Sequence, residues 1–295
     1  MLPDWMEGTD IAFPNLGIYL QNVPQSFTVF GFRITFYGVI IGIGVILAFL
    51  LIDRMAKKNG LDPDDFYDLG IYVLIFGIIG ARLYYVIFSW DMYKNDLLSI
   101  FNTRQGGLAI YGGVIAGFLT LIIYCKIKKK SMAALGDVAV MGLLVGQIVG
   151  RWGNFTNREV FGKYTDNLFA MRLPESAVRS ADITADIREH MIPGTNYIQV
   201  HPTFLYESFA NLVLLILILV FQKKKKFDGE IALWYLSGYG LIRFFVEGIR
   251  TDQLMIWHTT IPVSQLLGGY LFIAAMLAII VLRIQKSKNV VKAKS

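Results

Sequence analysis

Long apolar stretches separated by shorter polar segments make up most of the chain. Each has about the 20 residues that an α-helix needs to cross a bilayer core of about 30 Å. We predict seven such helices, over residues 35–52, 68–88, 106–125, 132–150, 204–221, 230–249 and 262–282. This pattern predicts an all-α integral membrane protein.

The remaining segments suggest how the chain is divided. We expect an extracytoplasmic arm at residues 1–34, lying on the membrane surface or folded as a short hairpin, and a basic cytoplasmic tail at 283–295. Helices one to four fall in 35–150, and helices five to seven in 204–282. The segment 151–203 is far longer than a usual connection. We therefore predict that it forms a small extracytoplasmic cap.

Composition agrees with a membrane protein, since 55% of residues are hydrophobic, 17% are charged and the mean hydropathy is +0.52. The net charge of +6 lies in short basic runs at the ends of apolar stretches, so we expect no nucleic-acid binding. Of the 28 lysines and arginines, 16 lie in one alternate set of loops and ten in the other, six of those ten in the long segment. Cytoplasmic loops carry the excess. We therefore expect the N-terminus outside and the C-terminus inside.

The two remaining cations, Arg82 and Arg243, fall inside predicted helices. An arginine in hydrocarbon costs at least about 2.5–3.5 kcal/mol and suggests a functional site. Both lie about 9 Å from the outer ends of their helices. Tyr37, Tyr111 and Arg151 fall at the same level. We expect a site there, near the outer-leaflet headgroups.

On the sixth helix Tyr235, Tyr239, Arg243 and Glu247 recur every four residues and share one face, with Arg250 close by. The alternative interpretation is an internal Arg243–Glu247 ion pair that only locks the bundle.

Glycines mark the second and third helices. Gly77 and Gly80 permit close approach of another helix, and Arg82 beside them either binds substrate or only pairs with a carbonyl or an acid. Four glycines in the eight residues Gly106–Gly113 predict a bent or loosely wound helix start near Tyr111.

The segment Gly150–Gly162, GRWGNFTNREVFG, fills every fixed position of G-R-x-G-N-F-x-N-x-E-x-x-G. It resembles the signature of the bacterial phosphatidylglycerol–prolipoprotein diacylglyceryl transferases. Arg33–Gly38, His201–Glu207 and Arg243–Arg250 are similar to further segments of that family. The resemblance extends over essentially the whole chain.

The resemblance implies transfer of the diacylglyceryl group of phosphatidylglycerol to the lipobox cysteine thiol of a preprolipoprotein in the bacterial cytoplasmic membrane, without a cofactor. Arg151 and Arg243 would contact the phosphate, because arginine offers a fork of donors suited to it. We expect Tyr111 and Glu247 to join them as catalytic residues. The expected substrate-binding residues are Tyr37, Asn154, Asn157, Glu159, Gly162, His201, Arg82, Tyr239 and Arg250.

The chain departs from many members of the family at Tyr111, where those members carry a histidine proposed as the base. A phenol with a pKa of about 10 is a poor base at neutral pH. Either Tyr111 only positions the substrate and the base is Glu247, Glu159 or water, or the arginines lower the pKa of the thiol or the phenol. We favour the first.

Two other classes compete with this interpretation. A seven-span transporter or receptor would bind its ligand without chemistry, but no internal repeat is visible. A phospholipid synthase would need clustered aspartates for a metal. Such a cluster, Asp62, Asp64, Asp65 and Asp68, fits better the acid-rich start of a helix around Pro63. We expect no metal, since no H-E-x-x-H spacing is present and Cys125 is the single cysteine.

Overall fold

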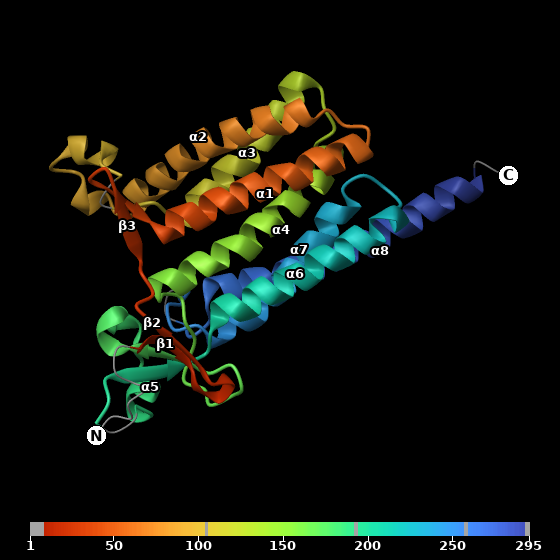
Figure 1. The fold of residues 1–295 in the computed structure, drawn as a ribbon. Helices are drawn as coiled ribbons and strands as arrows, with labels where there is room; N and C mark the ends of the chain where they lie inside the picture. Colours follow the sequence, from red (N-terminus) through yellow and green to blue (C-terminus); the bar gives the residue numbers. More distant parts are fainter. Residues whose placement is uncertain (1–8, 104–105, 192–193, 257–258, 293–295) are drawn as a thin grey trace. The chain divides into compact units, whose positions relative to one another are not determined.

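The computed structural model describes residues 9–103, 106–191, 194–256 and 259–292. Its α-helices are α1 (Phe36–Lys58), α2 (Pro63–Phe88), α3 (Ile110–Lys128), α4 (Met132–Asn157), α5 (Ala185–Glu189), α6 (Thr203–Phe221), α7 (Glu230–Ile249) and α8 (Val263–Lys292). Its strands are β1 (Thr9–Phe13), β2 (Ile18–Gln21), β3 (Ser26–Val29), β4 (Phe32–Thr35), β5 (Met171–Pro174) and β6 (Tyr197–Val200) (Figure 1). The chain is therefore mostly helical.

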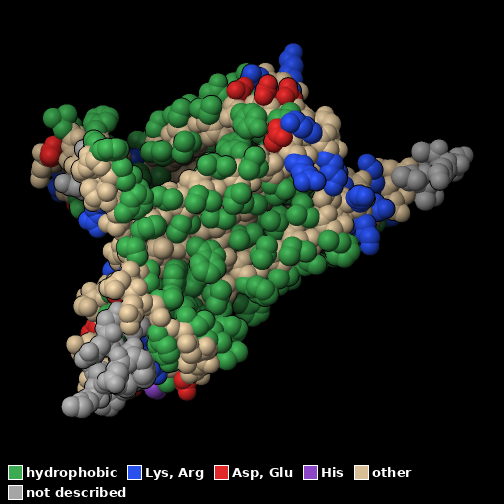
Figure 2. All heavy atoms as spheres, viewed as in Figure 1, with side chains coloured by type: hydrophobic (Ala, Val, Ile, Leu, Met, Phe, Trp, Pro, Cys, Tyr) green, Lys and Arg blue, Asp and Glu red, His purple; other side chains and the backbone are tan. Residues whose placement is uncertain are grey.

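Six of these helices are long and apolar enough to cross a membrane: α1, α2, α3, α4, α6 and α8. The predicted span 230–249 coincides with α7, which is not among the six. Its 20 residues include three charged side chains, Glu230, Arg243 and Glu247. Length and apolarity thus support a multi-pass membrane protein, and Figure 2 shows hydrophobic side chains covering much of the helical surface.

The α4 helix extends beyond the predicted end at residue 150 and continues to Asn157. The first half of the glycine-rich signature is therefore helical rather than part of a loop. Arg151 and Asn154 are three residues apart and lie on one face. A change from apolar to polar residues was a poor guide to the helix end here, because polar side chains do not interrupt the backbone hydrogen bonds of a helix.

The chain separates into two compact units. The first holds residues 1–48 and 140–295, and the second holds residues 49–139. In the first unit α7 packs against both α6 and α8 (Figure 1). The approach to α8 is close at Gly240, where a Cβ would lie 2.6 Å from the Gly268 carbonyl oxygen. Small residues therefore bring these helices together.

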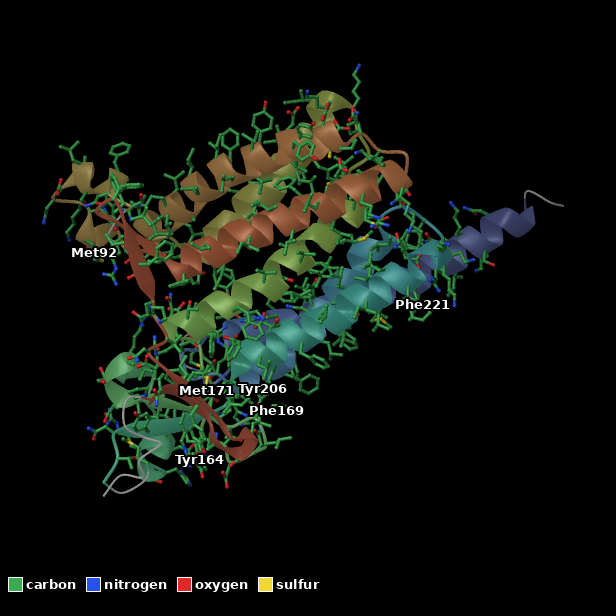
Figure 3. All side chains as sticks on the ribbon, in the orientation of Figure 1. Met92, Tyr164, Phe169, Met171, Tyr206 and Phe221 are labelled. Atoms are coloured by element: carbon green, nitrogen blue, oxygen red, sulfur yellow. The ribbon has the colours of Figure 1, made fainter. Side chains whose placement is uncertain are left out.

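The first unit also contains a four-stranded antiparallel sheet in the order β2-β1-β5-β6. Alternate residues of β5 and β6 point inward, since Met171, Leu173, Ile198 and Val200 are all buried. They form a small core with Ile11 and Phe13 of β1, Ile187 of α5, Phe204 of α6 and two residues outside these elements, Phe161 and Ile183. Figure 3 places Met171 and Tyr164 in this region. The sheet is an addition to the predicted all-α architecture.

A separate hairpin pairs β3 with β4. Its two turn residues, Phe30 and Gly31, both have positive φ, which favours a tight hairpin turn. Phe30 at the tip is 97% exposed.

In the second unit α2 and α3 approach most closely at Gly80 and Gly112, where a Cβ on either would overlap the other helix. The predicted close approach at the glycines of the second helix is confirmed. The start of α2 also follows the prediction: Asp62 accepts a hydrogen bond from the backbone N–H of Asp64 at 3.0 Å, and Pro63 is the first helical residue.

Candidate functional site

Three helices of the first unit bring two arginines to one carboxylate. Glu207 on α6 accepts a hydrogen bond from Arg151 Nη2 of α4 at 2.7 Å through Oε1. Its other oxygen, Oε2, accepts from Arg243 Nη1 of α7 at 3.1 Å. Glu207 is 1% exposed and lies next to Tyr206, which Figure 3 labels in the first turns of α6. A buried carboxylate thus holds both guanidinium groups in place.

The predicted stripe on α7 faces this carboxylate. The Tyr239 hydroxyl donates to Glu207 Oε1 at 3.3 Å, and the Tyr235 ring stacks on Tyr239 with centroids 5.6 Å apart. Arg243 also forms an ion pair with Glu247, one turn further along. The ion pair that the alternative interpretation required is present. Arg243 nevertheless bridges to a second helix, so it does more than pair within its own helix.

Glu207 lies in a segment that resembles the family, but no role was predicted for it from the sequence. The signal that could have identified it is the one used for the arginines: an ionisable residue inside an apolar helix marks a site by default. Acids inside the predicted helices needed the same scrutiny.

The side-chain amides in the last turn of α4 converge on Glu159, which lies just beyond the end of that helix. Asn154 and Asn157 donate to Glu159 Oε1 at 3.0 and 3.3 Å. Asn154 in turn accepts from Arg151 Nη1 at 3.1 Å. The signature therefore supports Arg151 through a chain of hydrogen bonds that starts at Glu159.

The end of the signature joins two of the three other matching segments, those of His201 and Arg250, through the backbone. The Gly162 N–H donates to the His201 carbonyl at 3.0 Å, and Gly162 also bridges Arg250 in antiparallel fashion. A Cβ on Gly162 would lie 2.8 Å from His201 Cβ and 2.9 Å from the Ile249 carbonyl oxygen. Only glycine fits where these segments cross.

Replacing Gly162 by alanine is expected to lower the stability of the first unit by about 1–3 kcal/mol, because a methyl group is forced into a closely packed site. Thermal unfolding in detergent measures this loss. Gly146→Ala is the matched control, since nothing lies within 4 Å of its Cβ position in α4. A Gly162→Ala protein as stable as the control variant would contradict the packing argument.

The side chain of His201 forms polar contacts next to the point where these segments cross. Its Nδ1 lies 3.3 Å from the Tyr206 hydroxyl and 3.5 Å from Asn167 Nδ2. Burial lowers the pKa of His201 below its ordinary value, so the imidazole is neutral at neutral pH. A neutral ring that contacts a hydroxyl and an amide serves as a hydrogen-bonding brace.

Arg250 follows α7 and extends the charged cluster. Its Nε and Nη2 donate to the two carboxylate oxygens of Asp252 at 2.9 and 2.7 Å, and its Nη1 lies 3.6 Å from Glu247. Burial raises the pKa of Asp252, but the Arg250 hydrogen bonds and charge outweigh it and hold that pKa below its usual value. The cluster thus contains equal numbers of positive and negative side chains: Arg151, Arg243 and Arg250 against Glu207, Glu247 and Asp252.

Tyr37 lies in the first turn of α1 and packs on Gly153 of α4. A Cβ on Gly153 would lie 2.7 Å from Tyr37 Cδ2. The second glycine of the signature therefore makes room for this tyrosine ring. Tyr37 thereby lies against the helix that carries Arg151.

Two predicted site residues, Arg82 and Tyr111, belong to the second unit. Arg82 is buried and hydrogen-bonded to backbone carbonyl groups, which is the structural alternative considered for it. Tyr111 is the second residue of α3. Gly106 and Gly107 precede that helix with positive φ, so the expected bend before Tyr111 is present.

The cluster offers fixed cationic donors, tyrosine hydroxyls and amides around a buried carboxylate. Such a set suits the binding of a phosphate group and the stabilisation of negative charge. Among the described residues, no group of three or more His, Cys, Asp or Glu could hold a metal ion.

Comparison with known proteins gives a consistent family. A family model described as prolipoprotein diacylglyceryl transferase matches residues 24–281. A phosphatidylglycerol–prolipoprotein diacylglyceryl transferase of Finegoldia magna is 39% identical over 269 residues, covering 91% of this chain and 97% of that protein. Proteins of the same name from Clostridioides difficile and Halalkalibacterium halodurans are 39% and 40% identical, over 78% and 83% of this chain and 84% and 81% of theirs.

The family match includes the signature, the Glu207 segment and the α7 stripe, which are the parts of the chain that build the arginine cluster. The chain belongs to the prolipoprotein diacylglyceryl transferase family and is a transferase of lipoprotein biosynthesis in a bacterial membrane.

Proposed function

We propose that the protein transfers the diacylglyceryl group of phosphatidylglycerol to the lipobox cysteine thiol of preprolipoproteins. The thiol sulfur attacks the glyceryl carbon that carries the phosphate. A carbon–sulfur bond forms, the carbon–oxygen bond to phosphate breaks, glycerol phosphate leaves and the thiol proton passes to a base. The observation that carries the proposal is the meeting of Arg151 and Arg243 on Glu207.

The arginine pair supports the departing phosphate. Negative charge grows on the bridging oxygen as the carbon–oxygen bond breaks, and preorganised donors in a water-poor site stabilise such charge most. Glu207 holds Arg151 and Arg243 by one nitrogen each, and each guanidinium has further N–H groups. We assign those groups to the phosphate.

The surrounding residues hold the lipid headgroup and the arginines. Asn154, Asn157 and Glu159 orient Arg151 through their shared hydrogen bonds, and Glu247 orients Arg243. Tyr239 and Arg250 extend the polar surface toward the headgroup hydroxyls. Tyr37, Gly162 and His201 shape the site through packing and backbone contacts.

Membrane topology completes the proposal. We place α7 in the membrane as a seventh span beside the six apolar helices, because it packs between α6 and α8. The N-terminus and the cap lie outside, the C-terminus is cytoplasmic and the site lies near the outer leaflet. The lysines of residues 223–226 and of the last turns of α8 fit the cytoplasmic side. The cap would receive the lipobox peptide.

Replacing Tyr111 by phenylalanine is expected to leave kcat within about threefold of wild type, because a phenol is a poor base at neutral pH. Steady-state rates of Tyr111→Phe and Tyr111→His measure this. A loss of about a hundredfold or more in the Phe variant, with recovery in the His variant, would instead assign general-base catalysis to this position.

The test of the proposed function is a reaction in proteoliposomes with phosphatidylglycerol and a lipobox peptide. Mass spectrometry follows the thioether product, and the released glycerol phosphate is measured in the same samples. We expect product with the cysteine peptide and none when serine replaces that cysteine. Absence of product from folded wild-type protein across several anionic phospholipids would reject the proposal and favour binding or transport without chemistry.

A further inference from the structure

Arg82 on α2 is a buried cation whose environment differs from that of Arg151 and Arg243. Its exposed fraction is 7%. Among the described residues, no carboxylate forms a salt bridge with it. Its guanidinium instead lies 5.1 Å from the centre of the Tyr93 ring and among backbone carbonyl groups. A buried charge is stable only when neighbouring groups pair with it or accept its hydrogen bonds. The backbone carbonyl groups around Arg82 must therefore take this role.

All five N–H groups of Arg82 are used within one loop. A guanidinium has one N–H on Nε and two on each Nη. Nε donates to one carbonyl oxygen, and each Nη donates to two. The acceptors are Ile100 at 2.7 Å, Ser99 at 2.8 Å, Asn102 at 3.1 Å, Gly106 at 3.1 Å and Gly107 at 2.9 Å. No N–H group is left for a phosphate.

The loop is shaped to fit the guanidinium. Gly107 has a φ of +80°, and a Cβ there would overlap Arg82 and lie 3.0 Å from the Tyr85 ring. The 3₁₀-helix η4 (Leu97–Phe101) supplies the carbonyls of Ser99 and Ile100. The neighbouring 3₁₀-helix η3 (Trp90–Met92) carries Met92, labelled in Figure 3. We call the described residues 97–103 and 106–107 the carbonyl loop.

The carbonyl loop leads directly into α3. The Ala109 N–H donates to the carbonyl of Ala81, the residue before Arg82, at 3.0 Å. Gly112 then packs against Gly80. The start of α3 is thus attached to the same turn of α2 that carries Arg82. Tyr111 lies between these two attachments, so its position depends on the loop.

We infer that Arg82 is a positioning residue that organises the carbonyl loop and thereby places Tyr111, and that it does not bind the substrate phosphate. The inference rests on the proposed function and on the interpretation favoured from the sequence, that Tyr111 positions the substrate. Lysine cannot replace arginine here, since one ammonium nitrogen with three N–H groups does not span five carbonyls.

The first arm of the test is hydrogen–deuterium exchange of the full-length protein in detergent. Arg82→Lys is expected to raise exchange in peptides covering 97–109 by about tenfold, with no change in the cap peptide 171–200. Arg54→Lys is the matched control, because Arg54 is an exposed arginine of the same unit. Gly107→Ala disturbs the same contact but keeps the charge of Arg82. This variant replaces Arg82→Lys in the experiment if Arg82→Lys does not fold. Unchanged loop exchange in the variants would overturn the inference.

The second arm is a double-mutant cycle with the proteoliposome reaction. Arg82→Lys is expected to lower kcat/KM by about tenfold in wild type, but by about twofold or less in a Tyr111→Ala background, because it acts through Tyr111. Full additivity, or an increase only in the KM for phosphatidylglycerol, would overturn the inference. An inactive wild type would contradict the proposed function, while the exchange arm still tests whether Arg82 organises the loop.

Discussion

Replacing Arg151 by alanine is expected to lower kcat/KM for diacylglyceryl transfer by about a thousandfold. The reason is the loss of a fixed cationic donor at the departing phosphate, a kind of interaction that is strongest in the transition state. Arg151→Lys keeps the charge but not the planar fork, so we expect it to recover only part of the activity. The proteoliposome reaction, with glycerol phosphate release as the readout, measures both variants.

Arg188→Ala provides the control for Arg151. Arg188 of α5 pairs with Glu175 at 3.0 Å, and its side chain is about half exposed. An exposed ion pair contributes little to stability, so this variant should retain wild-type activity. If Arg151→Ala retained activity like this control, the phosphate would have to be held by other residues.

Replacing Glu207 by glutamine is expected to reduce both stability and activity. The substitution leaves Arg151 and Arg243 without their shared carboxylate, and breaking a buried ion pair costs about 3–5 kcal/mol. The side-chain amide also presents N–H groups toward guanidinium donors. Because both arginines lose their positions, we expect kcat to fall by about a hundredfold. Thermal unfolding and single-turnover rates separate the two effects.

Glu230→Gln is the matched control for Glu207→Gln. Glu230 is also fully buried and pairs with one arginine, Arg283, at 2.5 Å, but it is the first residue of α7 and lies at the end of that helix away from Arg243. This variant should lose stability while its kcat stays within about twofold of wild type. A Glu207→Gln enzyme with the same behaviour would show that Glu207 only joins helices and does not position the arginines for chemistry.

Tertiary contacts decided the structural features that the sequence analysis missed. Glu207 became the centre of the cluster because α4 and α7 both pack toward α6, although their residues are far apart in the chain. Arg82 could be located in a helix from the sequence, but its five carbonyl partners come from a loop whose path depends on two glycines with positive φ. The four-stranded sheet joins β1 to β5, which are more than 150 residues apart.

The sequence by itself determined what depends on near neighbours along one helix. Apolar length located the helices, the four-residue spacing put Tyr239, Arg243 and Glu247 on one face, and Asp62 and Pro63 marked the start of α2. These features follow from helix geometry and local hydrogen bonds, which a short window of residues contains. Only the tertiary structure decided which buried charges pair, because each buried charge must find its partner among residues that packing brings close.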